Sequence, residues 1–400
     1  MEIYLVGGAV RDTLLGLPVK DRDWVVVGGT PQQLLAQGYT PVGRDFPVFL
    51  HPVTHEQVAL ARTERKTAPG YQGFAIHAAP DVTLEQDLAR RDLTINAMAV
   101  PQAQTDAAGN FDPRHATLID PYGGRADLAA RQLRHVTDAF REDPVRILRI
   151  ARFAARFADF RVTLDTLALM QAMVAQGEAA ALVAERVWQE LSSGLMAGMP
   201  SRMLLVLQAC DALDAVLPEL AASSSALCAH ALDMLDRCAA LDVTLEVRFA
   251  CLCLHVPAVA QGGAGTIRRL CERLKVPTHC RDLSELAARE RSALQTCTDL
   301  DAEGLVGLLE RCDAFRKPGR IGALMQVMAC DTPDWSPGTA YPARDVLLAA
   351  LDAARAVRTE PVVEEVRQAG LGESAIGPRM HLARVRAVAA TREQTSANAP

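Results

Sequence analysis

The fold of this chain is decided by the stretch Tyr4-Leu5-Val6-Gly7-Gly8-Ala9-Val10-Arg11-Asp12, followed closely by Lys20-Asp21-Arg22-Asp23-Trp24-Val25-Val26-Val27. The pattern predicts a strand, a glycine turn, a short helix and a second strand. Because the apolar run ends at two glycines, the backbone can turn tightly there and approach a ligand. The helix that follows directs its free N–H groups at that turn, which predicts a phosphate site.

Three charged side chains flank this turn. Arg11 lies in the first turn of the expected helix and adds a fork-shaped cation. Asp21 and Asp23 stand two residues apart on the second strand, so both project from one face, roughly 7 Å apart at the backbone. A Gly-Gly pair before a helix is by itself usually only a turn, and an Asp-x-Asp pair by itself is usually only a solvated strand end. Together, paired carboxylates beside a phosphate cradle predict a site for two Mg²⁺ ions.

Composition limits the class of protein. The 400 residues suggest two to four domains, and Ala and Leu dominate after about residue 125, which favours helices. The net charge of −6 means that a nucleic-acid partner would need local basic patches. The ten cysteines form no CxxC pair and indicate free thiols in a reducing compartment. With no apolar run of about 18 residues and no signal-peptide pattern, we expect a cytoplasmic protein without a membrane span.

The next segments predict the rest of an α/β head. Trp24 to Val27, followed by Gly28-Gly29, predicts a buried strand, and Thr30-Pro31 predicts a capped short helix. Strands are expected near residues 42–50 and 57–63. Residues 64–83 combine charge, Gly and Pro, which predicts a mobile loop near the site.

A second basic segment, Arg90-Arg91-Asp92-Leu93-Thr94-Ile95-Asn96-Ala97, follows an expected helix. Arg90 to Asp92 could be only an ion pair at a helix end, which contributes little at a surface. Alternatively, Arg91 contacts the triphosphate or ribose of a nucleotide while Asp92 holds it in place.

A third basic segment begins at Arg141-Glu142-Asp143-Pro144 and predicts a helix capped by Asp143, with Pro144 in its first position. Arginines recur along one face at positions 146, 149, 152 and 156. Such a stripe is usually a solvated face. Since no acid is interleaved, we interpret it as the binding surface of an anionic ligand.

These motifs resemble the class II tRNA nucleotidyltransferases, the CCA-adding enzymes, and the related bacterial poly(A) polymerases. The similarity covers about the first half of the chain. It is carried by GGAVRD (7–12), DRDWVV (21–26), RRDLTINA (90–97), DPYGG (120–124), EDPVRILR (142–149) and ERVWQE (185–190).

The resemblance implies roles for particular residues. It implies that Asp21 and Asp23 hold Mg²⁺ and are catalytic. The residues that it implies for nucleotide binding are Gly8, Arg11 and Arg91 at the triphosphate and sugar, Asp143 and Arg146 at the base, and Arg149 and Arg152 close by. The loop at residues 64–73 lies where the family carries a flexible loop that helps the change from adding C to adding A.

The implied fold class is α+β, with four parts: a mixed-sheet nucleotidyltransferase head (1–140), a helical neck (141–215), a helical body (216–330) and a helical tail (331–400), disordered past Arg392. Many relatives carry a metal-dependent phosphohydrolase in the body, marked by adjacent His and Asp. This chain has Leu254 and His255 at those positions. Without the carboxylate we expect the fold of that domain but not its activity.

The implied function is template-independent addition of C, C and A to the 3′ end of tRNA from CTP and ATP. The nearest alternative is a poly(A) polymerase or an A-adding enzyme; residues 43–52 look more like CCA enzymes. A further alternative is a non-catalytic RNA-binding relative, against which the intact Asp21, Asp23, Arg91 and Asp143 argue. No obligate protein partner is expected.

Overall fold

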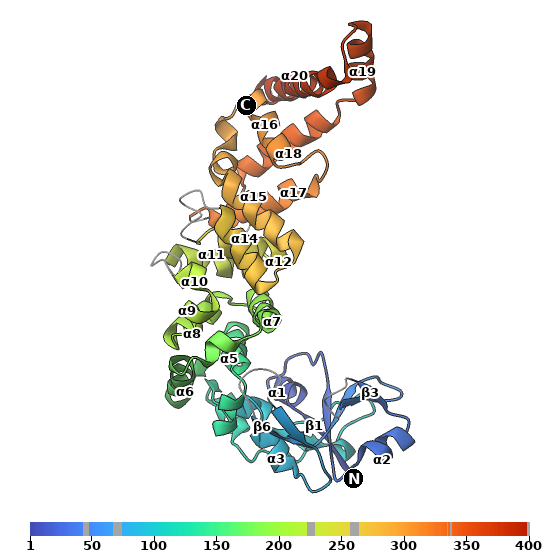
Figure 1. Cartoon of the computed structure of the whole chain (residues 1–400), viewed down its shortest axis with the longest axis vertical. Coiled ribbons are helices and arrows are strands. Elements are labelled where there is room, and N and C mark those ends of the chain that lie inside the picture. Colours follow the sequence, from blue (N-terminus) through green and yellow to red (C-terminus); the bar gives the residue numbers. More distant parts are fainter. Residues whose placement is uncertain are drawn as a thin grey trace. The chain divides into compact units, whose positions relative to one another are not determined.

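The computed structural model describes residues 1–42, 48–66, 74–221, 229–256, 264–333, 335–336 and 338–397. The chain divides into two compact units, an N-terminal unit (Met1–Gly194 and Arg202–Pro218) and a C-terminal unit (Leu195–Ser201 and Glu219–Pro400). Figure 1 shows the strands in the N-terminal unit and helices throughout the C-terminal one. The predicted order, a mixed sheet followed by helices, is confirmed.

The head is built on a six-stranded sheet in the order β3-β4-β5-β2-β1-β8. Its strands are β1 (Glu2–Val6), β2 (Asp23–Val27), β3 (Thr40–Val42), β4 (Val48–Leu50), β5 (Gln57–Leu60) and β8 (Ala99–Pro101). The sheet is mixed because β2 pairs with β5 in parallel, whereas β2 pairs with β1 antiparallel. Both strands of the opening motif therefore lie next to each other near the middle of the sheet.

Short helices surround this sheet. They are α1 (Gly8–Leu14), α2 (Pro31–Ala36) and α3 (Leu84–Ala89), with a 3₁₀ turn at Thr94–Asn96. The predicted cap of α2 is confirmed, since the Thr30 hydroxyl accepts a hydrogen bond from the Gln33 N–H. Val6, Val25 and Leu88 belong to a fully buried core between the sheet and α3. This core fixes where the strand ends of β1 and β2 lie.

The predicted loop at residues 64–83 is only partly a loop. Strands β6 (Thr63–Lys66) and β7 (Phe74–His77) pair antiparallel as a hairpin. Residues 67–73, where charge, Gly and Pro are densest, lie outside the described residues, as do residues 43–47 of the stretch that favoured CCA enzymes. Backbone pairing corrects the prediction at the ends of the segment, because hairpin hydrogen bonds do not require an apolar pattern.

After the sheet the chain is mainly helical. The elements are α4 (Gly124–Ala129), β9 (Gln132–Leu133), α5 (Val145–Arg156), β10 (Arg161–Val162), α6 (Leu164–Ala175), α7 (Ala184–Leu195), α8 (Ser201–Ala209), α9 (Leu213–Val216) and α10 (Pro218–Ala221). Helix α5 begins at Val145, one residue later than predicted. Its apolar side, including Ile147 and Ile150, is fully buried.

Helices account for the C-terminal unit. They are α11 (Ala229–Ala240), α12 (Leu245–Cys253), α14 (Ala264–Leu274), α15 (Thr278–Gln295), α16 (Ala302–Arg311), α17 (Gly319–Asp331), α18 (Pro342–Arg355), α19 (Thr359–Gln368) and α20 (Ile376–Ala397). Helix α20 continues past Arg392, which corrects the expectation of disorder for residues 393–397. A tertiary contact explains the difference, because the Arg392 guanidinium donates to the carbonyl oxygen of Leu300.

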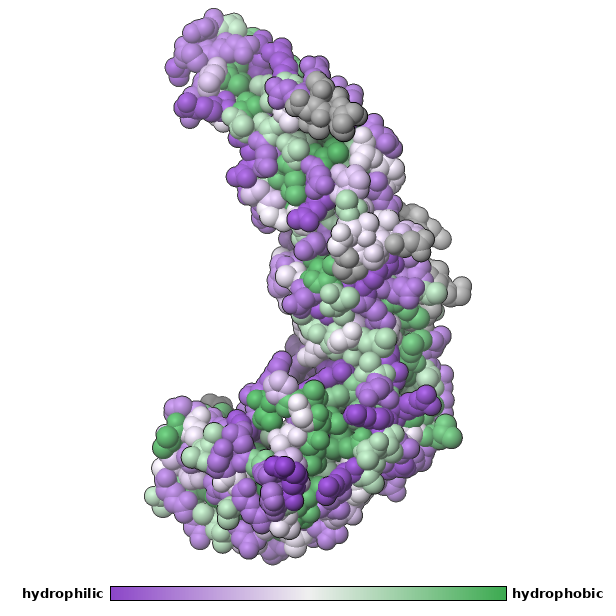
Figure 2. All heavy atoms as spheres, turned by 180° about the vertical axis from the view of Figure 1, so that it is seen from behind, coloured by the Kyte–Doolittle hydropathy of each residue, from purple (hydrophilic) through white to green (hydrophobic). Residues whose placement is uncertain are grey.

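The surface and the helix lengths bear on the membrane prediction. Figure 2 shows hydrophilic and hydrophobic residues intermixed on the visible face of both units. Within the part of the chain that the structure describes, every helix is too short or too polar to cross a bilayer.

Candidate active site

The glycine turn between β1 and α1 lies against two guanidinium groups. Gly7 has φ +72°, a backbone conformation that favours glycine, and a Cβ there would lie 2.9 Å from Nη1 of Arg91. A Cβ on Gly8 would lie 3.4 Å from Nη2 of Arg11. The two glycines therefore bring Arg11 and Arg91 against the turn. The sequence analysis placed Gly7 in the turn but named only Gly8 for nucleotide binding.

Arg11 is held inside the unit. It is 3% exposed, and its guanidinium donates to Asp12 Oδ1 (2.9 Å) and Asn96 Oδ1 (2.5 Å). The ring of Phe153 on α5 and the ring of Phe157, directly after α5, lie 5.3 and 5.2 Å from the guanidinium carbon. Burial lowers the pKa of Arg11, against the attraction of Asp12. Arg11 therefore ties the glycine turn to α5 by contacts that its position on α1 alone did not reveal.

The two predicted catalytic carboxylates lie at the start of β2. Asp23 is the first residue of the strand, whereas Asp21 lies two residues before it, which corrects the prediction that both lie on the strand; both residues are exposed. Although Asp23 is open to solvent at its surface, the chain packed around it partly desolvates the carboxylate and so raises its pKa; the nearby Arg91 and Arg149 lower the pKa, and the Asp21 carboxylate raises it further. Two exposed carboxylates that repel each other provide the oxygen donors that a divalent cation takes. The donor set therefore fits such an ion.

Arg91 is held by an acid that the sequence analysis missed. Asp87 is fully buried and accepts from Nη2 of Arg91 (3.2 Å) and Nη2 of Arg90 (2.7 Å). Burial raises the pKa of Asp87, but the two arginines outweigh it and lower the pKa overall. The prediction that Asp92 holds Arg91 is therefore wrong. The available signal was the spacing of four residues from Asp87 to Arg91 on one helical segment.

Asp92 instead pairs with the arginine stripe of α5. Three of the four stripe arginines form ion pairs with acids from other elements. The pairs are Arg149 with Asp92 (2.7 Å), Arg152 with Glu190 (2.5 Å) and Arg156 with Asp12 (2.8 Å). The argument that the stripe needs an anionic ligand to balance its charge is therefore wrong, because the partners come from distant parts of the sequence. Arg149 still lies within electrostatic reach of Asp23.

Asp143 and Arg146 are three residues apart at the start of α5, but they form hydrogen bonds with different groups. Asp143 Oδ1 accepts from the Val145 N–H (3.1 Å), as a cap would, and both Asp143 oxygens accept from the Arg186 guanidinium (3.1 and 2.7 Å). Arg146 is 8% exposed and donates to the carbonyl oxygens of Ala139 and Arg90, each at 2.7 Å. Arg186 on α7 is a further contact that the sequence analysis missed.

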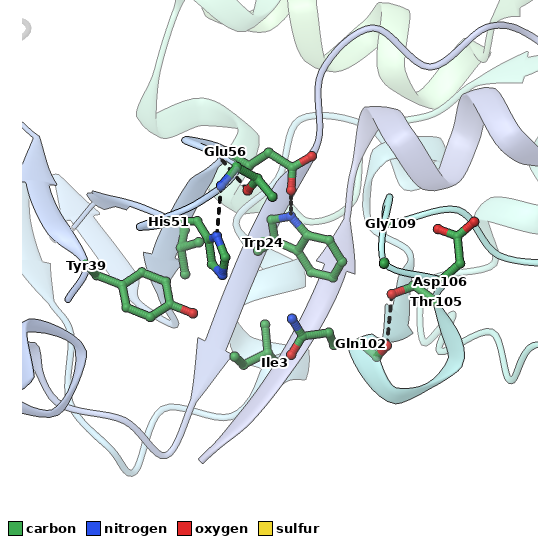
Figure 3. Close-up of a pocket in the computed structure, with 12 residues that line it drawn as sticks. Ile3, Trp24, Tyr39, His51, Glu56, Gln102, Thr105, Asp106 and Gly109 are labelled. Carbon is green, nitrogen blue, oxygen red and sulfur yellow. Dashed lines mark hydrogen bonds between the residues drawn. The ribbon is translucent and has the colours of Figure 1, made fainter. Parts of the chain in front are cut away.

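A separate pocket of about 300 Å³ lies in the head. Figure 3 shows the Trp24 indole between Tyr39 and His51 on one side and Gln102 and Asp106 on the other. Because side chains alternate along a strand, Trp24 and Asp23 project from opposite faces of β2. This pocket is therefore distinct from the carboxylate site.

In the C-terminal unit, the structure groups His255 with two residues that the sequence analysis did not single out. The ring nitrogens of His230 and His255 and an oxygen of Asp331 lie within 4.8 Å of one another. Both Asp331 oxygens already accept from Arg291, at 2.7 and 2.6 Å. The Arg291 guanidinium is therefore already bonded to the Asp331 carboxylate that a divalent cation would need as a ligand.

Comparison with known proteins identifies the family. Residues 3–134 match the family described as poly A polymerase head domain, and residues 159–223 match the probable RNA- and SrmB-binding site of polymerase A. A multifunctional CCA protein of Polaromonas naphthalenivorans is 51% identical over the full length of both chains, and one of Variovorax paradoxus is 52% identical over 98% of this chain and 99% of that protein. The chain belongs to the family of multifunctional CCA proteins.

Solved structures support the same fold. A CCA-adding enzyme in an apo form has TM-score 0.72 and 20% identity, over 100% of this chain and 92% of that one. The Thermotoga maritima CCA-adding enzyme, solved in complex with tRNA, matches with TM-score 0.69 and 21% identity. The match covers 97% of this chain and 87% of that enzyme. At these identities the likeness concerns the fold. The predicted family and fold class are confirmed.

Proposed function

We propose that this protein adds C, C and A to the 3′ end of tRNA, using CTP and ATP and releasing pyrophosphate. The observation that carries the proposal is the place of Asp23, which pairs with Val6 directly before the glycine turn and lies within electrostatic reach of Asp21, Arg91 and Arg149. The curated relatives, about half identical over the whole chain, are CCA proteins.

The nucleotide's triphosphate is held at the glycine turn. The Gly8 backbone lies against Arg11, and Gly7 lies against Arg91, so an anion at this turn meets two cations. Arg91 makes the direct contact to triphosphate or sugar, oriented by the buried Asp87. Arg11 supports the turn from within, because its guanidinium is already bonded to the protein.

Nucleotidyltransferases of this family use divalent metals. We assign the metal here as Mg²⁺ and its ligands as Asp21 and Asp23. When bound, Mg²⁺ supplies Lewis-acid activation of the RNA 3′-hydroxyl and neutralises charge at the α-phosphate. The two carboxylates orient the site from one strand end, and Arg91 compensates the charge of the phosphates.

Asp143 and Arg146 read the base. C and A share an exocyclic amino donor beside a ring-nitrogen acceptor, which a carboxylate and a guanidinium can match. Arg186 orients the Asp143 carboxylate. Arg146 would exchange one of its two carbonyl acceptors for the ring nitrogen. Arg149 and Arg152 lie on the same helix and bring positive charge near the nucleotide. Their ion pairs with Asp92 and Glu190 neutralise part of that charge.

The helical remainder binds tRNA by shape and phosphate contacts. We retain the four-part division into head, neck, body and tail as a finer proposal than the two compact units. All described cysteines are free, which supports the proposed cytoplasmic location. We expect no obligate protein partner.

The test uses purified protein and tRNA that lacks its 3′ CCA end. CTP alone should extend the tRNA by two nucleotides, ATP alone should add nothing, and both should complete the end. The matched control is tRNA that ends in CC, which should accept A from ATP alone. Addition of A without C on the truncated tRNA, or long A tails on unrelated RNA, would instead indicate an A-adding enzyme or a poly(A) polymerase.

A further inference from the structure

Three cysteines meet in the interior of the C-terminal unit. Cys238 lies on α11, Cys251 on α12 and Cys330 on α17, and these three helices pack against one another (Figure 1). Each cysteine is fully buried, and the three sulfur atoms lie within 4.8 Å of one another. The Cys238 thiol donates to the Cys251 sulfur at 3.3 Å. The proposed nucleotidyl transfer uses none of these groups.

A buried cysteine usually acts as a small apolar side chain. The surroundings here are different, because two cations lie nearby. Arg248 on α12 is 2% exposed and is fixed by the carbonyl oxygens of Val243 and Leu195. Arg237 on α11 donates to the carbonyl oxygens of Thr332 and Trp335, shortly after Cys330 in sequence.

Charge and hydrogen bonding favour a thiolate in this group. Hydrogen bonds from Cys238 and Cys251 lower the pKa of the Cys330 thiol, and Arg237 and Arg248 act in the same direction. The pKa values of the other two thiols are raised. Thiolate sulfur is the form that binds metals, and the two nearby cations favour that form here.

The spacing also fits a central cation. Bonds of about 2.3 Å from one cation to three thiolates place the sulfur atoms about 4 Å apart. The observed sulfur positions, from 3.3 Å for one pair to at most 4.8 Å, bracket that value. Three thiolates carry three negative charges, and Arg237 with Arg248 supplies two positive ones, so a monovalent or divalent cation leaves little net charge buried.

We propose that Cys238, Cys251 and Cys330 bind one thiophilic cation, Zn²⁺ or Cu⁺. The cation forms three metal–sulfur bonds, and the protons of those ligands that are thiols before binding are released to solvent. Soft thiolate ligands select these ions over Mg²⁺. The neighbouring His230, His255 and Asp331 lie on or just after the same helices, but Asp331 is neutralised by Arg291, so the sulfur group is the favoured site.

The experiment uses the full chain, reduced and stripped of metal by chelators. Zn²⁺ is titrated in competition with a chromophoric chelator, and Cu⁺ in competition with a cuprous-specific chelator, which distinguishes the two ions. We expect one equivalent bound, with release of protons on binding near pH 7, because each ligand must be a thiolate. Cd²⁺ serves as a probe, because thiolate ligation gives an ultraviolet charge-transfer band.

Variants separate the site from other thiols. Cys238→Ala, Cys251→Ala and Cys330→Ala should each weaken binding by more than the roughly 10- to 100-fold effect of losing a supporting neighbour. The matched control is Cys253→Ala, which removes a fully buried cysteine from the same helix as Cys251 and should leave affinity unchanged.

A second measurement avoids variants that fail to fold. Bound metal should slow alkylation of Cys238, Cys251 and Cys330 in the native chain, measured for each cysteine by mass spectrometry, and should leave Cys253 unaffected. Absence of stoichiometric binding of both ions, binding that survives loss of all three cysteines, or equal effects of Cys251→Ala and Cys253→Ala would each overturn the proposal.

Discussion

Replacing Asp143 by Ala separates a base-reading carboxylate from a helix cap. The substitution removes the hydrogen bond to the Val145 N–H, a loss of about 1 kcal/mol for a cap. It also leaves Arg186, whose side chain is 29% exposed, without its carboxylate, and such a partly exposed pair contributes about 0–1 kcal/mol. We therefore expect a stability loss of about 1–2 kcal/mol, seen as a lowering of the melting temperature by several degrees.

The effect on nucleotide choice should be larger. If Asp143 accepts from the amino group of C or A, the variant leaves that donor unpaired in the site, at a cost of about 1–3 kcal/mol. The ratio of kcat/KM for CTP over UTP on truncated tRNA should then fall about tenfold or more. Arg186→Ala should lower the same ratio to a smaller extent, since it only orients the carboxylate.

The matched control is Asp301→Ala. Asp301 caps α16 in the C-terminal unit by accepting from the Gly304 N–H at 2.8 Å, so its loss should lower the melting temperature without changing nucleotide choice. An unchanged CTP over UTP ratio in Asp143→Ala, with the same stability loss as the control, would reduce Asp143 to a cap and refute the base-reading role.

Four further predictions follow from the geometry. Asp21→Ala and Asp23→Ala should abolish nucleotide addition and shift stability by no more than about 0.5 kcal/mol, because both side chains are exposed; wild-type turnover in Mg²⁺ would sink the metal assignment. Asp87→Ala should destabilise the fold by about 3–5 kcal/mol, because it removes the buried carboxylate with which Arg90 and Arg91 pair; unfolding by denaturant measures this loss. With Leu254 and His255 at the positions of the family's His and Asp, Ni²⁺ or Mg²⁺ should support no phosphatase or 2′,3′-cyclic phosphodiesterase activity; robust hydrolysis that survives Asp21→Ala would contradict this. Burial lowers the pKa of His255 to about 4, whereas the pKa in the unfolded chain is about 6.5. The free energy of unfolding should therefore be independent of His255 above pH 6.5 and decrease by up to roughly 3 kcal/mol as the pH falls toward 4. His255→Gln should make this decrease smaller.

Local patterns predicted much of the site. The glycine turn and the helix after Pro144 depend on residues that are close in sequence, and the structure has both; of the two carboxylates, Asp23 begins the predicted strand and Asp21 lies two residues before it. Alternation along a strand and the period of a helix are properties of the backbone itself, so side-chain direction could be predicted without knowing the neighbours.

The sequence by itself therefore determined the family, the order of sheet and helices and the residue types of the candidate site. Only the tertiary structure decided how those charges are paired. Arg156 meets Asp12 across 144 positions, and Arg149 meets Asp92 across 57. The three cysteines come together from helices separated by up to 92 positions in the same way. A charge on a helix face is visible in its own segment, but the group that neutralises it is chosen by packing between distant segments, which no local pattern encodes.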